Sequence, residues 1–111
     1  MRLWIDDVRP APEGYVWCKS VNQAKESIIL REQWKGLPWP FEIGDETIQP
    51  FELIDIDHDA GEFSSEGGDY IKLLDWLEET SRNYPIRIHS MNPVGVANMR
   101  AIIKRNGWEE V

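Results

Sequence analysis

Residues 3–7 are Leu3-Trp4-Ile5-Asp6-Asp7, an apolar run that stops abruptly at two acids. A short apolar run of this kind is typical of a buried strand, and the acids mark where the strand reaches a polar sheet edge. Two later segments repeat the pattern. Phe51–Ile56 runs into Asp57-His58-Asp59, and Pro85–Ile88 ends at His89-Ser90. We therefore expect three strands that end in polar side chains.

Helical patterns alternate with these strands. Ser20 and Gln23 have the spacing of a capping box, and Asn92-Pro93 places a good cap before a proline at the first helical position. This alternation predicts an α/β domain with a mostly parallel sheet, right-handed crossovers and one unit spanning residues 1–111. The expected helices are Val21–Trp34, Asp69–Ser81 and Pro93 to about Arg105, the last closed by Asn106-Gly107. Further strands are expected at Tyr15–Cys18 and Trp108–Val111, with a hairpin over Phe41–Pro50 around Gly44-Asp45. Loops are expected at Val8–Gly14 and Gly61–Gly68.

Composition excludes several classes of function. The chain has 111 residues and a net charge of -8, with its cations scattered, so binding to duplex nucleic acid is not expected. No apolar run approaches the ~20 residues of a membrane span, and two early acids argue against a signal peptide. Cys18 is the only cysteine, which fits a reducing cytoplasm, and we expect it to be buried and inert.

Four acids lie at the predicted strand ends. In open parallel sheets, ligands bind beyond the carboxyl ends of the strands. If the first and third strands are neighbours, Asp6, Asp7 and Asp57 lie close together, and Asp59 follows. Ionised carboxylates packed this closely need a cation. Oxygen ligands favour Mg²⁺, Ca²⁺ or Mn²⁺ over zinc, while two nearby histidines leave Mn²⁺ or Zn²⁺ open, and we expect Mg²⁺ with Mn²⁺ as the alternative. The other interpretation is that these acids cap loops and helices and hold no metal.

The only two histidines, His58 and His89, also lie at this predicted edge. Histidine can transfer protons near neutral pH or bind a metal, so we expect at least one to have a functional role. Ser90 and the helix start at Asn92, Val94 and Gly95 offer a hydroxyl and backbone N–H groups for a phosphate. Simple capping by Asn92 explains the same residues equally well. Arg9 is a further candidate for the phosphate, although an ordinary surface arginine is the simpler interpretation.

Three motifs carry a resemblance to a known family. They are Asp-Asp-x-Arg-Pro at residues 6–10, Asp-His-Asp at 57–59 and His-Ser-x-Asn-Pro at 89–93. The arrangement resembles the receiver domain of two-component response regulators. It resembles the receiver-derived family called cyclic-phosphate processing receiver domains more closely, over essentially the whole chain.

The resemblance implies a flavodoxin-like three-layer fold with sheet order 2-1-3-4, with or without a fifth strand. It implies that Asp6, Asp7 and Asp57 bind the metal, that Asp57 matches the phosphoacceptor and that Ser90 matches the conserved hydroxyl residue. His58 and His89 match the features that separate this family from ordinary receivers. The chain departs from receivers in two ways. The Val8–Gly14 loop is too short for the usual first helix, and no lysine follows a fifth strand, which disfavours phosphorelay signalling.

The leading hypothesis is a metal-dependent phosphoesterase that acts on a cyclic phosphate, either of a nucleotide or of an RNA end. Asp57, His58 and His89 are the expected catalytic residues, with the two histidines as a general acid and base in an order that is left open. One alternative is a module that binds a cyclic nucleotide without cutting it. The other is a signalling receiver phosphorylated at Asp57.

Overall fold

The structure is a computed structural model that describes residues 1–37 and 47–111. Within these residues, four strands form one parallel sheet in the order β2-β1-β3-β4, which confirms the expected sheet order. The strands are β1 (Arg2–Ile5), β2 (Tyr15–Cys18), β3 (Ile54–Ile56) and β4 (Ile86–Ile88). The helices are α1 (Val21–Gln33), α2 (Ile71–Glu79), α3 (Pro93–Asn106) and the short 3₁₀ helix η1 (Gly61–Ser65).

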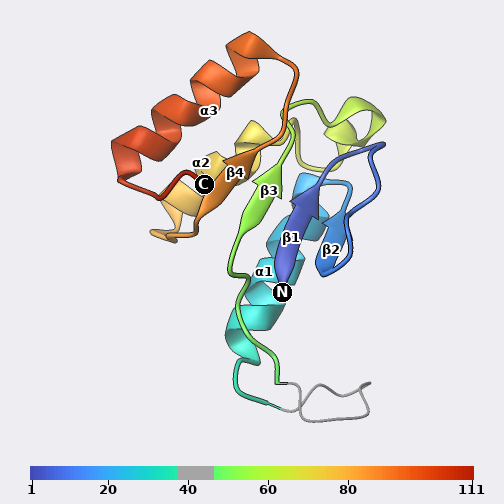
Figure 1. Cartoon of the computed structure of the whole chain (residues 1–111), viewed down its shortest axis with the longest axis vertical. Helices are drawn as coiled ribbons and strands as arrows, with labels where there is room; N and C mark the ends of the chain where they lie inside the picture. The colour runs from blue at the N-terminus through green and yellow to red at the C-terminus, as the bar shows by residue number, and fades with distance from the viewer. Residues whose placement is uncertain (38–46) are drawn as a thin grey trace.

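The helices α1 and α2 lie behind the sheet in Figure 1, on one of its faces. This follows from the chain path, because the connections β2-α1-β3 and β3-α2-β4 step across the sheet in the same direction and right-handed crossovers then use the same face. The step from β1 to β2 runs the other way. Residues 6–14 make that step as a loop, as expected from its length, and Trp4 Nε1 donates to Arg9 O in it at 2.8 Å. In the described chain, this loop replaces the first helix of the usual receiver arrangement.

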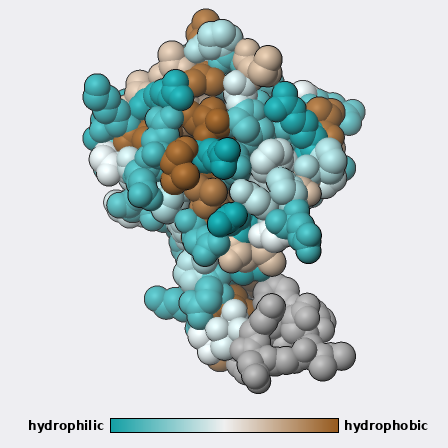
Figure 2. Space-filling view, in the orientation of Figure 1, coloured by the Kyte–Doolittle hydropathy of each residue, from teal (hydrophilic) through white to brown (hydrophobic). Residues whose placement is uncertain are grey.

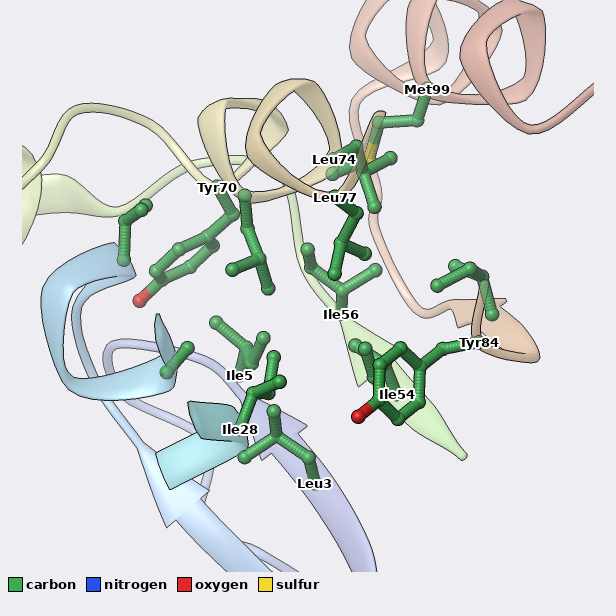
Figure 3. Close-up of a cluster of buried hydrophobic side chains, with 14 of the residues drawn as sticks. Leu3, Ile5, Ile28, Ile54, Ile56, Tyr70, Leu74, Leu77, Tyr84 and Met99 are labelled. Carbon is green, nitrogen blue, oxygen red and sulfur yellow. The ribbon is translucent and has the colours of Figure 1, made fainter. Parts of the chain in front are cut away.

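One hydrophobic core fills the space between the sheet and the helices (Figure 3). Leu3 and Ile5 alternate along β1 with Trp4, which lies on the opposite face of the sheet and outside this core. Cys18 is buried as predicted, and burial raises the pKa of its thiol. The fully buried side chains labelled in Figure 3 are Leu3, Ile5, Ile28, Ile54, Ile56, Tyr70, Leu74, Leu77 and Met99.

The predicted helix caps are present. Ser20 Oγ accepts from Gln23 N at 3.1 Å, and Asn92 Oδ1 accepts from Gly95 N at 3.0 Å. Gln23 Oε1 accepts from Lys19 N, one residue before the position that a reciprocal capping box uses. Gly107 ends α3 with φ +70°, a backbone conformation that favours glycine.

Some boundaries differ from the sequence-based expectation. The expected strand Phe51–Ile56 is regular only over Ile54–Ile56, although Glu52 N still donates to Met1 O. Helix α2 is shorter than expected and stops before Ser81, whose φ of +55° cannot continue a helix. The terminal strand is reduced to a single parallel bridge between Ile86 and Glu110.

Two further expectations concern the loops and the membrane. The Gly61–Gly68 loop contains η1, and the hairpin expected over Phe41–Pro50 lies largely outside the described residues. None of the helices in the described ranges is long and apolar enough to cross a membrane.

Candidate functional site

Three carboxylates lie together beyond the carboxyl ends of the two central strands. Asp6 and Asp7 follow β1, and Asp57 follows its neighbour β3, where Asp57 N donates to Ile5 O. One oxygen from each carboxylate lies within 4.8 Å of the others. The parallel pairing of β1 with β3 therefore assembles an acidic cluster of Asp6, Asp7 and Asp57 from two segments 50 residues apart in the chain.

Asp6 is the anchored member of the acidic cluster. Its side chain is fully buried, and its Oδ1 accepts hydrogen bonds from Val8 N and Arg9 N, each at 2.9 Å. Its Oδ2 accepts from His89 Nε2 at 3.0 Å. Burial alone would raise the pKa of Asp6, but the two backbone N–H groups and His89 outweigh it, so the pKa lies below its ordinary value. Asp6 is therefore held in its ionised form.

Asp7 differs from Asp6 in its electrostatics. Burial raises the pKa of the Asp7 carboxyl, and the negative charges of Asp6 and Asp57 raise it further. Its Oδ2 lies against the backbone at Gly61, where an added β-carbon would overlap it. Gly61 has φ +56°, so both its backbone conformation and this close approach require glycine. At Asp7, the negative charges of the cluster are therefore not balanced by a neighbouring positive charge among the residues that the structure describes.

His89 lies between two carboxylates. Its Nδ1 is 2.6 Å from Asp55 Oδ1, and its Nε2 is 3.0 Å from Asp6 Oδ2. Its ring also stacks on the indole of Trp4, with centroids 3.9 Å apart and planes 6° from parallel. Carboxylates only accept hydrogen bonds, so with both ionised the two ring nitrogens both donate. With both ring nitrogens donating, the His89 ring would carry a positive charge between two buried acids.

His58 has a different environment. Its Nδ1 is 2.8 Å from Asp59 Oδ1, and its ring packs on the first turn of α3 at Gly95, where an added β-carbon would overlap the imidazole. Asn92 Nδ2 lies 3.5 Å from both His58 Nδ1 and Asp59 Oδ1. Among the described residues, no hydrogen-bond partner is found for His58 Nε2. Asp59 thus orients the imidazole and leaves one ring nitrogen available.

The predicted phosphate-binding residues other than Arg9 lie at or just before the start of α3. Ser90 Oγ accepts from Asn92 N at 3.2 Å, and Asn92 satisfies both Gly95 N, through Oδ1, and Val96 N, through its carbonyl oxygen. Capping therefore uses most of the N–H groups in the first turn. Val94 N and the Ser90 hydroxyl proton have no acceptor among the described residues. Within the described residues, these two groups are the ones at this helix start left to contact an anion.

Several expected and unexpected residues complete the site. Asp59, grouped with the metal-binding acids from its position, lies outside the acidic cluster and pairs with His58. The Arg9 side chain is exposed. Its backbone N donates to Asp6 Oδ1, and its carbonyl oxygen accepts from Trp4 Nε1. Sequence reasoning did not assign a functional role to Asp55, Trp4 or Gly61, and it assigned Gly95 only to the phosphate contact and not to the packing against His58. Only Asp55 carried a signal, because a charged residue inside an apolar strand is rare.

The chemistry of the acidic cluster fits a hard divalent cation. All three side chains offer oxygen, which Mg²⁺ and Mn²⁺ prefer. Both oxygens of Asp6 already accept hydrogen bonds, whereas Asp7 is partly exposed and has the raised pKa. Asp57 is also partly exposed, and its Oδ1 accepts from His58 N at 2.7 Å. Asp7 and Asp57 would therefore hold the ion directly, with Asp6 behind them.

A parallel sheet in the order 2-1-3-4, with this acidic cluster at its carboxyl edge, defines a receiver-like α/β protein. The chain belongs to the family of cyclic-phosphate processing receiver domains, since the model of that family matches residues 1–105. Comparison with curated proteins gave no match, and neither did comparison with solved structures.

Proposed function

We propose that this chain is a metal-dependent phosphoesterase that opens a cyclic phosphate, of a nucleotide or of an RNA end, in the cytoplasm. The observation that carries the proposal is the meeting of the acidic cluster, the Asp59–His58 pair and the start of α3 at one sheet edge. These parts supply a cation site, a proton carrier and an anion contact. Each of the three can contribute to the hydrolysis of a phosphate ester.

The acidic cluster gives the substrate its electrostatic partner. Asp6, Asp7 and Asp57 repel a phosphate on their own, and burial together with the same crowding of negative charge raises the pKa of Asp7. When bound there, Mg²⁺ or Mn²⁺ would neutralise phosphate oxygens and make water a better nucleophile. The Ser90 hydroxyl and Val94 N–H would then orient the phosphate from the side of α3.

His58 is the proton carrier in this proposal. Asp59 accepts from Nδ1–H, which leaves Nε2 as the basic nitrogen of a neutral imidazole. A carboxylate that fixes the tautomer of a histidine in this way is a common arrangement for general acid–base catalysis. His58 Nε2 would take a proton from the attacking water and return it to the leaving oxygen of the opened ring.

His89 takes a different role from the one expected from sequence. Both of its nitrogens are engaged by Asp55 and Asp6, so neither is available to exchange a proton with substrate. We therefore assign His89 as a fixed cation that holds Asp6, and His58 alone as the acid–base residue. This replaces the expected pair of acid–base histidines.

The test is ³¹P NMR of the protein with Mn²⁺ or Mg²⁺ and a mixture of 2′,3′- and 3′,5′-cyclic nucleotides. We expect a cyclic signal to convert to a monoester, and the conversion to stop in Asp57→Ala and to slow by ~10²-fold or more in His58→Ala. Asp69→Asn, which changes an acid that only accepts from Ala60 N, serves as the control and should retain activity. Unchanged cyclic signals with metal present would refute hydrolysis of these nucleotides.

The same spectra distinguish a binding module. A cyclic nucleotide that broadens with the protein and metal but is never converted would indicate binding without turnover. The extensive internal capping of α3 favours this second candidate, because few free N–H groups remain to stabilise a transition state.

A further inference from the structure

We propose that Asp55 and Trp4 are positioning residues of this site, which hold the His89 ring with Nε2 directed at Asp6. The inference deepens the proposed function and rests on it only where turnover is measured. Neither residue lies in the acidic cluster. Both act through His89, one at the edge of its ring and one on its face.

Asp55 has features of a residue retained for a specific partner. It lies in the middle of β3, and its side chain is only 4% exposed. A buried carboxylate is costly unless it is paired, and replacing a whole buried ion pair by apolar residues of similar size is often neutral or stabilising. Arg87 is its aligned neighbour on β4, but no ion pair joins the two among the described residues. The partner of Asp55 is His89 Nδ1, at 2.6 Å.

Trp4 holds the face of the same ring. Its indole stacks on His89 at 3.9 Å between centroids, and it is itself fixed by the hydrogen bond from Nε1 to Arg9 O. Tyr15 packs edge-on against Trp4, with ring centroids 5.8 Å apart and planes at 82°. A hydrogen-bonded indole supported by a second ring is a rigid surface, so it limits the rotation of the imidazole out of its plane.

Together the two contacts determine which nitrogen faces the acidic cluster. With Nδ1 on Asp55 and the ring flat on Trp4, Nε2 points at Asp6 Oδ2. Asp6 Oδ1 is already held by two backbone N–H groups. The result is a chain of contacts, Trp4 and Asp55 to His89 to Asp6, that fixes one wall of the candidate metal site. Outer contacts of this kind orient the inner residues of metal sites.

The experiment uses the fact that the chain has only two histidines. Two-dimensional ¹H–¹⁵N spectra tuned to imidazole nitrogens give one set of ring signals for His58 and one for His89. The variants are Asp55→Asn, Trp4→Leu and Trp4→Phe, with Asp59→Asn as the matched control because it removes the equivalent charge beside His58. The spectra require no substrate and no metal.

We expect Asp55→Asn and Trp4→Leu to shift or broaden the His89 signals and leave those of His58 unchanged. Asp59→Asn should do the reverse, and Trp4→Phe should restore most of the wild-type spectrum because it keeps a flat ring. His89 signals that stay at their wild-type positions in Asp55→Asn and Trp4→Leu would overturn the proposal. So would equal changes in both histidines, because these would indicate a general loss of structure.

A second measurement tests the link to the site. Mn²⁺ affinity or turnover should fall by roughly 10-fold or more in Asp55→Asn, the usual effect of removing an outer contact. A lower kcat with KM nearly unchanged would support positioning. Wild-type Mn²⁺ affinity and wild-type turnover in Asp55→Asn would overturn it. If the wild-type protein shows no turnover, the proposed function fails, whereas the spectra and Mn²⁺ affinity still decide whether Asp55 and Trp4 position His89.

Discussion

The imidazole of His58 lies directly on the backbone of Gly95, in the first turn of α3. A β-carbon added at Gly95 would overlap Cγ and Cδ2 of His58. Asn92, three residues earlier, caps the same turn and lies near Nδ1 of that ring. This contact joins the loop after β3 to the helix after β4, so it brings the candidate proton carrier next to the candidate phosphate contact.

Replacing Gly95 should therefore affect activity more than stability. Alanine is a better helix former than glycine by about 1 kcal/mol, which offsets part of the cost of the overlap. We expect Gly95→Ala to unfold near the wild-type denaturant midpoint and to lose ~10-fold or more in kcat, because His58 is displaced. Denaturant unfolding and initial rates measure the two effects. Asn98→Ala, on the exposed side of α3, is the control and should change neither.

Removal of each of the two histidines should lower the free energy of unfolding by a different amount. His89→Ala leaves Asp6 and Asp55 buried without a cation, and breaking a buried pair in this way costs about 3–5 kcal/mol. His58 pairs with a single acid, Asp59, whose side chain is 62% exposed, so the loss of this pair in His58→Ala should cost about 1 kcal/mol or less. Urea unfolding of the two variants provides the comparison. Equal losses of stability would contradict the assignment of His89 as the fixed cation.

Asp7→Asn should change stability in opposite directions with and without metal. Without metal, it removes a charge that Asp6 and Asp57 repel, so the free energy of unfolding should stay the same or rise. With wild-type protein, Mn²⁺ at 100 times its Kd should add about 2.7 kcal/mol to that free energy. Most of this gain should be absent in Asp7→Asn. Thermal melts with and without Mn²⁺ measure it, and a full metal-dependent gain in the variant would exclude Asp7 as a ligand.

The ion pair between Glu32 of α1 and Arg82, in the segment between α2 and β4, predicts a pH dependence of stability. Burial would raise the pKa of Glu32, but hydrogen bonds from Arg82 and Tyr84 lower it below its ordinary value. A lowered folded-state pKa contributes stability that is complete above the unfolded-state value and is lost as the pH falls through the folded-state value. The free energy of unfolding should therefore decrease once the pH is lowered beneath about 4.5, the ordinary pKa of glutamate.

Glu32→Gln isolates that contribution. The variant should be less stable than wild type at pH 7, and the difference between them should shrink as the pH falls. Glu26→Gln, at an exposed position of the same helix, should keep the wild-type dependence. A wild-type pH profile in Glu32→Gln would show that the pair with Arg82 contributes nothing to it.

Local patterns were sufficient to predict the strands that end in Asp6 and Asp57, because an apolar run and its polar end are read from adjacent residues. The sheet order followed from the family resemblance and is confirmed by the pairing. The caps at Ser20 and Asn92 were also predicted correctly, since both depend on neighbours three residues away.

The contacts that distinguish the two histidines could not be predicted in this way. Asp55 and His89 are 34 positions apart and meet only because β3 and β4 pair in one particular register. Trp4 has the sequence pattern of a core residue, but strand alternation places it on the opposite face of the sheet, where the loop of residues 6–14 takes the place of a helix. The roles of His58 and His89 therefore required the three-dimensional arrangement of side chains.

Hydrolysis in ¹⁸O-labelled water tests the central claim most directly. The wild-type protein, Mn²⁺ and a cyclic nucleotide are mixed in H₂¹⁸O, and the phosphorus product is followed by ³¹P NMR. The account predicts a phosphate monoester that carries one ¹⁸O atom, seen as a single isotope shift, with formation that depends on metal and on His58. Failure to form a monoester, or a monoester formed equally fast by His58→Ala, would contradict it.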